Sequence, residues 1–233
     1  MLRSRSYATR SVLAVVVVAM SVLLGACGGS SSPGSTAAPS GIELKTGPEI
    51  SAAAHAAALN AKSVHVKGNA GTTQIELSIG PNGTIGTVGV DGGKVDLVRL
   101  GDKSWIKADA AFWAKNGVPA ASATKLNGKY VDVSGQSGQF DGFSSVSKFF
   151  ATTSQASKTT KGETTTVDGA KVITLKDIDG SLLFVALNGE PFPMRVSSAG
   201  ASGGQIDFTD WNVPVTITAP TADQIVDVKT LGG

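Results

Sequence analysis

Cysteine and histidine are nearly absent from this chain, which has one cysteine and two histidines among 233 residues. A single thiol cannot form an internal disulfide, so no disulfide bond stabilises the fold. His55 and His65 alone cannot supply a histidine-rich zinc site, and the H-E-x-x-H pattern does not occur. We interpret His55 as a surface or packing residue of a helix. For His65, a solvent-facing position on a strand is favoured over a polar role at a cavity mouth or a role as a base.

Other catalytic and metal-binding patterns are missing too. The G-x-S-x-G nucleophile elbow is not found, because the stretch DGFSSV at residues 141–146 lacks the second glycine. Acidic turns such as DIDG at residues 177–180 lack the pattern of a calcium-binding loop, and Asp-Gly is what a tight hairpin turn requires. We therefore expect no enzyme activity, no metal and no cofactor.

Positive charge is scarce once the N-terminus is set aside. The formal net charge is +2, but Arg3, Arg5 and Arg10 all precede an apolar run. Removing these three leaves 17 basic residues against 18 acidic ones, a net charge of −1. Because binding to nucleic acid needs a surplus of clustered lysine and arginine, we expect no nucleic-acid partner. The hydrophobic fraction of 41% favours a packed domain over global disorder.

Residues 1–26 have the organisation of a lipoprotein signal peptide. A basic stretch precedes an apolar run of about 14 residues, which is shorter than the roughly 20 that a membrane-spanning helix needs. The run ends in Leu24-Gly25-Ala26-Cys27, which resembles the bacterial lipobox. This resemblance implies acylation of the Cys27 thiol, cleavage before Cys27 and anchoring at the extracytoplasmic face of the cell membrane. The alternative is an ordinary secretory signal with an incidental cysteine.

The rest of the chain divides into a tether, residues 27–46, and a single domain, residues 47–233. The tether is rich in Gly, Ser and Pro and has no periodicity, which is typical of a flexible linker. The domain opens with an alanine-rich helix over residues 47–63. From Ser63 onward, apolar and polar residues alternate in short runs between turn signals, which predicts about ten or eleven antiparallel strands.

Helical patterns interrupt these strands at residues 108–117, 118–128 and 143–153, and residues 221–228 are typical of a closing helix. We therefore predict an α+β fold, in which one large curved antiparallel sheet forms a half-barrel with short helices covering its concave face. Aromatic side chains of the helical insert either line an apolar cavity or simply fill the hollow of the sheet. The candidate cavity residues are Trp105, Phe112, Trp113, Phe149 and Phe150.

Three short motifs add a resemblance to a known family. They are Ser63-x-His65 after the first helix, Trp105 after the central strands, and WNVPV at residues 211–215 followed by Pro220. With the order of elements, they resemble the actinobacterial lipoproteins of the LppX/LprA/LprF/LprG group, whose fold is similar to the LolA/LolB carriers. The resemblance implies an apolar cavity for acyl chains of envelope glycolipids, complex lipids or triacylglycerol. This chain departs from it in having many inward Gly, Thr and Ala residues, and no headgroup-binding residue is transferable.

Two functions therefore stay open. The preferred one is a membrane-anchored, non-enzymatic envelope lipoprotein that binds or transfers lipid or glycolipid. The alternative is a surface-exposed lipoprotein that uses the sheet as a platform for a protein partner, whose identity the sequence does not indicate.

The first prediction concerns the anchor. We expect Cys27→Ala to abolish acylation, because the thiol is the only group in the lipobox able to form the thioether, and to move the protein from the membrane to the aqueous phase. Detergent phase partitioning and the mass of the mature N-terminal peptide measure both effects. Ser31→Ala in the tether serves as the control. A Cys27→Ala protein that still carries acyl mass would refute the lipobox assignment.

Overall fold

The computed structural model describes residues 40–90, 93–151, 158–200 and 203–227. All the described residues belong to one compact unit. The predicted signal peptide and Cys27 lie outside the described residues. Within the described ranges, no helix has the length and apolar character needed to cross a membrane.

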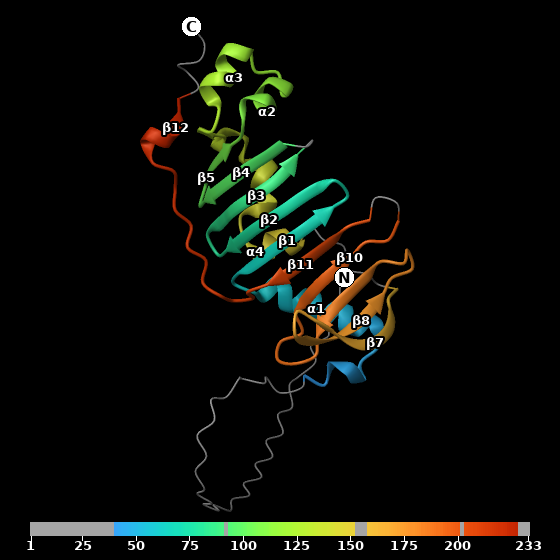
Figure 1. Ribbon diagram of the computed structural model, residues 1–233. Helices are drawn as coiled ribbons and strands as arrows, with labels where there is room; N and C mark the ends of the chain where they lie inside the picture. The colour runs from blue at the N-terminus through green and yellow to red at the C-terminus, as the bar shows by residue number, and fades with distance from the viewer. Residues whose placement is uncertain (1–39, 91–92, 152–157, 201–202, 228–233) are drawn as a thin grey trace, which may run out of the picture. The chain divides into compact units, whose positions relative to one another are not determined.

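Twelve described strands form one sheet, whose spatial order is β12-β6-β5-β4-β3-β2-β1-β11-β10-β9-β8-β7 (Figure 1). Their bounds are β1 Val64–Ala70, β2 Thr73–Gly80, β3 Gly83–Val90, β4 Gly93–Leu100, β5 Lys103–Lys107, β6 Tyr130–Asp132, β7 Thr160–Val167, β8 Ala170–Lys176, β9 Leu182–Ala186, β10 Pro193–Ser197, β11 Gln205–Thr209 and β12 Ile225–Val226. Two antiparallel meanders, β1–β6 and β7–β11, make up the sheet together with the short edge strand β12. Antiparallel pairing of β1 with β11 joins them, with His65 opposite Thr209.

Helices cover one face of this sheet. The described helices are η1 Ile42–Leu44, α1 Gly47–Asn60, α2 Ala110–Lys115, α3 Ala120–Leu126, η2 Ser134–Phe143, α4 Val146–Ala151 and η3 Ala222–Gln224. Figure 1 shows α1 and α4 on the same side of the sheet, whereas α2 and α3 lie together near the ends of β4 and β5. We call the face that α1 and α4 cover the inner face, and the opposite one the outer face.

Helix α1 has a well-defined start and a thin apolar stripe. The backbone N–H and the hydroxyl of Thr46 both donate to the Glu49 carboxylate, at 2.8 and 2.7 Å, and these bonds lower the pKa of Glu49. Ile50, Ala54 and Ala58 follow at spacings of four residues and are all buried. Because two of the three are alanines, the helix backbone lies close to the sheet.

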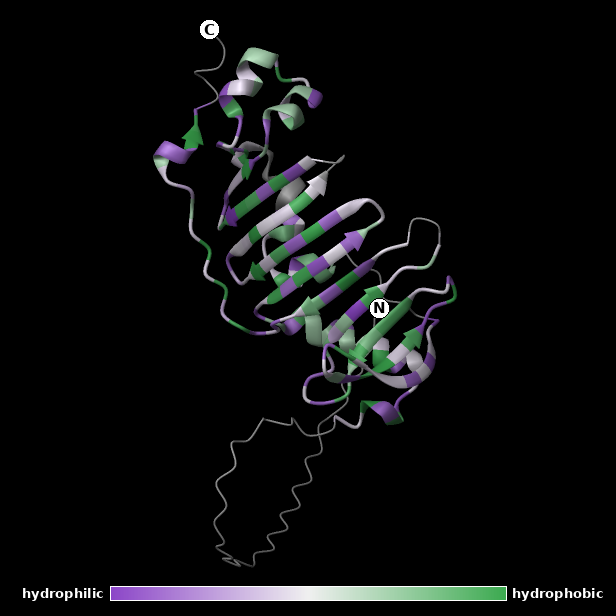
Figure 2. Cartoon of the chain, viewed as in Figure 1, coloured by the Kyte–Doolittle hydropathy of each residue, from purple (hydrophilic) through white to green (hydrophobic). Residues whose placement is uncertain are grey.

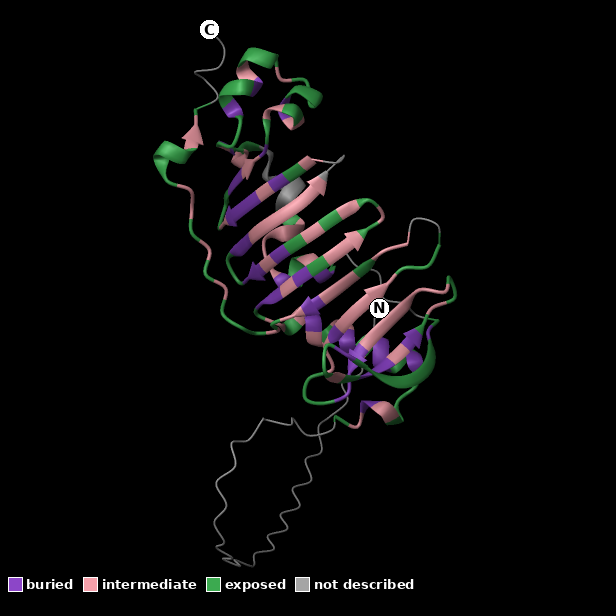
Figure 3. Cartoon of the chain, in the orientation of Figure 1, coloured by how far each residue is buried: buried purple, intermediate pink, exposed green. Residues whose placement is uncertain are grey.

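Hydrophobic and hydrophilic residues alternate along the central strands, as the bands in Figure 2 show. Because successive side chains point to opposite faces, this alternation places apolar side chains on the inner face. Val66, Leu77 and Leu97 belong to one inner row that crosses β1, β2 and β4, and Gly86 of β3 completes it. The outer face carries charged neighbours such as Lys67 and Glu76. At the sheet edge, β7 is exposed along most of its length (Figure 3).

The buried apolar residues form three clusters. The first joins the second half of α1 and α4 to β1, β2 and β11. The second packs the first half of α1 on β8 and β9 and includes Ile42, which is only 2% exposed. The third joins α2 and α3 to β4 and β6. Helix α1 therefore takes part in the clusters of both meanders.

The predicted fold class is confirmed as a mixed α+β domain with an open curved sheet and short helices. The predicted closing helix is corrected: within residues 221–227, η3 is followed by β12, which pairs in parallel with β6. Residues 213–220, whose sequence VPVTITAP predicts a strand, belong to no strand. Residues 40–45, assigned to the tether by sequence, pack on the domain: Ser40 donates to the Leu187 carbonyl at 2.9 Å.

The close strand spacing at Gly86 gives the second prediction. Gly86 has a φ of 153°, and a Cβ there would overlap the carbonyl oxygen of Glu76 on β2. We expect Gly86→Ala to lower the free energy of unfolding by more than the ~1–2 kcal/mol that left-handed strain alone costs. Gly101, with a φ of 61° and no atom within 4 Å of a built Cβ, provides the control variant Gly101→Ala. Equal losses in chemical denaturation would contradict the steric argument.

Candidate functional site

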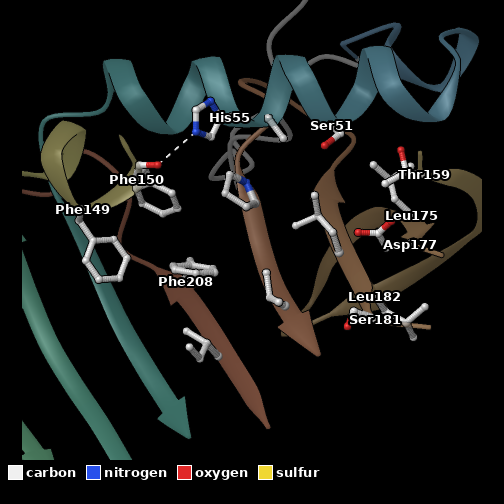
Figure 4. Close-up of a pocket in the computed structure, with 15 residues that line it drawn as sticks. Ser51, His55, Phe149, Phe150, Thr159, Leu175, Asp177, Ser181, Leu182 and Phe208 are labelled. Carbon is white, nitrogen blue, oxygen red and sulfur yellow. Dashed lines mark hydrogen bonds between the residues drawn. The ribbon is translucent and has the colours of Figure 1, made fainter. Parts of the chain in front are cut away.

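A cavity of about 310 Å³ lies between the inner face of β8–β11 and the helices α1 and α4 (Figure 4). Its walls come from both sides of the domain. Helix α1 and the chain next to it supply small or polar residues, whereas α4 and the strands supply aromatic and branched ones. The lining residues are Ser51, Ala54, His55, Phe149, Phe150, Thr159, Leu175, Asp177, Ser181, Leu182, Leu183, Pro193, Val196, Ile206 and Phe208.

One end of the cavity is aromatic. The ring centroids of Phe149 and Phe150 on α4 are 5.2 Å apart, and Phe208 of β11 lies 5.4 Å from Phe150. Trp211 supports these rings: its ring lies 5.6 Å from that of Phe150, and its Nε1 donates to the Pro193 carbonyl at 3.1 Å. These contacts fix the orientation of large apolar surfaces that face the cavity.

The other end of the cavity is polar, as Figure 4 shows for Asp177 and Ser181 beside Leu182. Both polar residues belong to the turn between β8 and β9, where the Asp177 N–H donates to the Ser181 carbonyl at 2.9 Å. The Asp177 Oδ1 accepts from the Ile178 N–H at 2.7 Å. A tight turn thus holds a carboxylate at the rim of an otherwise apolar space.

His55 connects the two helices that cover the cavity. Its Nε2 lies 3.1 Å from the Phe150 carbonyl oxygen, and because a carbonyl can only accept, this nitrogen carries the hydrogen. The bond is visible as the dashed line in Figure 4. His55 therefore supports the aromatic wall through the backbone of α4. The other histidine, His65, is half-buried on the outer face and has its Nδ1 3.1 Å from the Ser78 hydroxyl.

Titratable side chains are few around the cavity, where His55 and Asp177 are the ones among the lining residues. Within the described ranges, no group of three or more His, Cys, Asp and Glu residues is placed to hold a metal ion. Shifted pKa values occur away from the cavity: on the outer face, the Asp96 carboxylate raises the pKa of Lys107, and Asp207 raises that of Arg195. What the cavity offers is apolar surface with a few polar groups at one end, as is typical of ligand pockets.

The candidate residues from the sequence are divided among three places. Phe149 and Phe150 line the cavity. Trp113 is buried in the separate cluster of α2, α3, β4 and β6, and Phe112 packs against that cluster. Trp105 lies opposite Val98 on the outer face, because its neighbour Ile106 packs on the inner side. None of these last three lines the cavity.

Other residues that line the cavity carry weaker signals in the sequence. Val196, Ile206 and Phe208 alternate with polar residues, so the period of two identifies them as one face but does not say which face. The sequence predicts Asp177 as a turn residue and Ser181 as the start of a strand. Their closeness to α1 depends on the tertiary fold, and the sequence carries no local signal for it.

The third prediction tests the contact between α1 and α4. We expect His55→Ala to remove the hydrogen bond to the Phe150 carbonyl and to speed amide exchange in α4 about fivefold, because such a bond stabilises by about 1 kcal/mol. Hydrogen exchange measured by mass spectrometry resolves this change. Asn60→Ala, which removes a bond within α1 alone, is the control. Unchanged exchange in α4 would show that His55 does not hold this wall.

Comparison with known proteins identifies the fold. No family model matches the sequence, and no curated protein matches it. LprF from Mycobacterium bovis matches in structure with a TM-score of 0.55 at 16% identity, over 79% of this chain and 100% of that one. The Mycobacterium tuberculosis lipoprotein LppX matches with a TM-score of 0.47 at 18% identity, over 73% of this chain and 99% of that one. The structural resemblance suggested by the sequence is confirmed through LprF, and the domain therefore has the LprF fold.

Proposed function

We propose that this chain is a membrane-anchored, non-enzymatic protein of the cell envelope that binds or transfers lipid. The observation that carries the proposal is the cavity between α1, α4 and β8–β11, whose walls are mainly apolar. The LprF fold supports it, since the family resemblance implies a cavity for acyl chains at the same kind of place. Glycolipids of the envelope belong to the ligands that this resemblance implies.

Burial of acyl chains supplies the driving force in this proposal. Each methylene that leaves water for an apolar space contributes about 0.8 kcal/mol. Phe149, Phe150 and Phe208 provide rigid walls for such a chain, and Leu183 and Val196 face it from the strands. A lipid entering the cavity would replace water at surfaces that make few hydrogen bonds, so uptake needs no chemical step.

Anchoring through Cys27 belongs to the same proposal. An acylated Cys27 would hold the domain at the extracytoplasmic face of the membrane, near a source of lipid. The mature charge of about −1, calculated from the sequence, gives no strong attraction to anionic surfaces. The anchor, rather than surface charge, would then keep the domain at the membrane.

A protein-interaction module is the alternative, with the outer face of the sheet as its platform. That face carries ion pairs such as Lys67–Glu76 at 3.2 Å and Lys107–Asp96 at 2.9 Å. Exposed ion pairs of this kind contribute little to binding energy. The cavity therefore favours lipid binding.

The fourth prediction concerns a substitution that reduces the volume of the cavity. Leu183 lines it, whereas Phe184, the next residue of β9, does not. We expect Leu183→Trp to lower co-purified or added lipid by at least about tenfold, because the larger ring occupies much of the space. Phe184→Trp adds a similar ring to the opposite face and should leave uptake unchanged. Native mass spectrometry of both proteins measures the bound lipid.

Two results would contradict the proposal. The first is a wild-type protein that carries no lipid and takes up no fluorescent acyl probe. The second is equal lipid loss in both variants, which would place the lipid away from the cavity. Thermal unfolding of both variants identifies any loss that is due to misfolding.

A further inference from the structure

The cavity is small for a lipid with several chains. Its volume of about 310 Å³ lies at the lower end of the range of roughly 300–1,000 Å³ found for ligand pockets. A pocket at this end of the range suits one acyl or alkyl chain better than several.

The two ends of the cavity differ in polarity. Figure 4 shows Phe149, Phe150 and Phe208 on one side, and Asp177, Ser181 and Leu182 on the other. The polar end is close to the surface, because Asp177 and Ser181 are only half-buried and the side chain of Ile178, in the same turn, is 78% exposed. A ligand would therefore have its apolar part inside and its polar part at this rim.

The charge at the rim of the cavity determines which head groups of a ligand can bind there. Asp177 is acidic, and the lining residues include no lysine or arginine. Its Oδ1 accepts from the Ile178 N–H, and no described residue donates to its Oδ2. A hydroxyl or an ammonium group on a ligand can donate to this oxygen. A carboxylate or phosphate there would meet a like charge without a compensating cation.

We propose, on the basis of the lipid-binding function above, that the cavity binds a single-chain amphiphile whose head group is an uncharged or cationic hydrogen-bond donor. The chain lies against Phe149, Phe150 and Phe208, and the head donates to Asp177 with Ser181 beside it. The ligand class is therefore long-chain alcohols, monoacylglycerols or long-chain amines. Fatty acids and alkyl phosphates of the same chain length are disfavoured.

The test compares head groups on matched chains. The full-length chain carrying Cys27→Ser is titrated by calorimetry near neutral pH with dodecylamine, monolauroylglycerol, lauric acid and dodecyl phosphate, each below its micelle concentration. We expect the amine and the glycerol ester to bind at least about tenfold tighter than the acid and the phosphate, since a hydrogen bond to a charged group is involved.

Two variants locate the preference. Asp177→Asn keeps the size of the side chain and removes its charge. We therefore expect this variant to bind dodecylamine at least about tenfold more weakly and to bind lauric acid more tightly. Glu190→Gln removes an exposed carboxylate that follows β9 and does not line the cavity, and should leave the ranking unchanged.

The outcomes separate this inference from the function on which it rests. Equal binding of all four probes, or tightest binding of the acid, overturns the head-group preference and leaves lipid binding in place. Binding of none of them contradicts the proposed function as well. The order of the four affinities, measured with Asp177 in place, tests the head-group preference even if a variant unfolds. If Asp177→Asn folds and the order of affinities is unchanged, Asp177 does not cause the preference.

Discussion

The contact of helix α1 with the inner face of the sheet is the interaction on which the rest of the domain depends. Ile50 and Ala54 pack on β8 and β9, whereas Ala58 packs with β1 and β2, so one helix shields both meanders. Small side chains let α1 approach the backbone closely: a Cβ on Gly47 would overlap the Thr159 carbonyl oxygen. The same smallness leaves the hollow of the sheet incompletely filled. The cavity follows from an alanine-rich helix placed over a curved sheet.

The aromatic wall compensates where α1 contributes little volume. Helix α4 has only six residues, too few to be stable alone, so its position depends on tertiary contacts. Phe150 supplies them through the rings of Phe208 and Trp211 and through its carbonyl, which accepts from His55. Stability of the wall and shape of the cavity are therefore properties of the same few side chains.

Patterns of neighbouring residues in the sequence predicted the features of the fold that depend on neighbouring residues. Alternation correctly grouped Leu77 and Ile79 on one buried face, and helix propensity placed the first helix at Gly47. The side chains of Val215 and Ile217 do alternate, but they pack near Gly80 instead of extending a paired strand. Within the site, aromatic clustering found Phe149 and Phe150. Trp105 and Asp177 depend on register and on contacts between distant segments, which a single sequence does not encode in any local pattern.

The pairing of β1 with β11 has a consequence for how the chain reaches its native state. Each meander is built from neighbouring hairpins, which close short loops, but His65 meets Thr209 only across most of the domain. The entropic cost of closing so long a loop comes before any contact offsets it, and pairings between distant segments slow folding. Until this pairing forms, β1 and β11 both present unpaired edges to other chains. A newly synthesised molecule is thus most prone to aggregate in the interval before its two halves join.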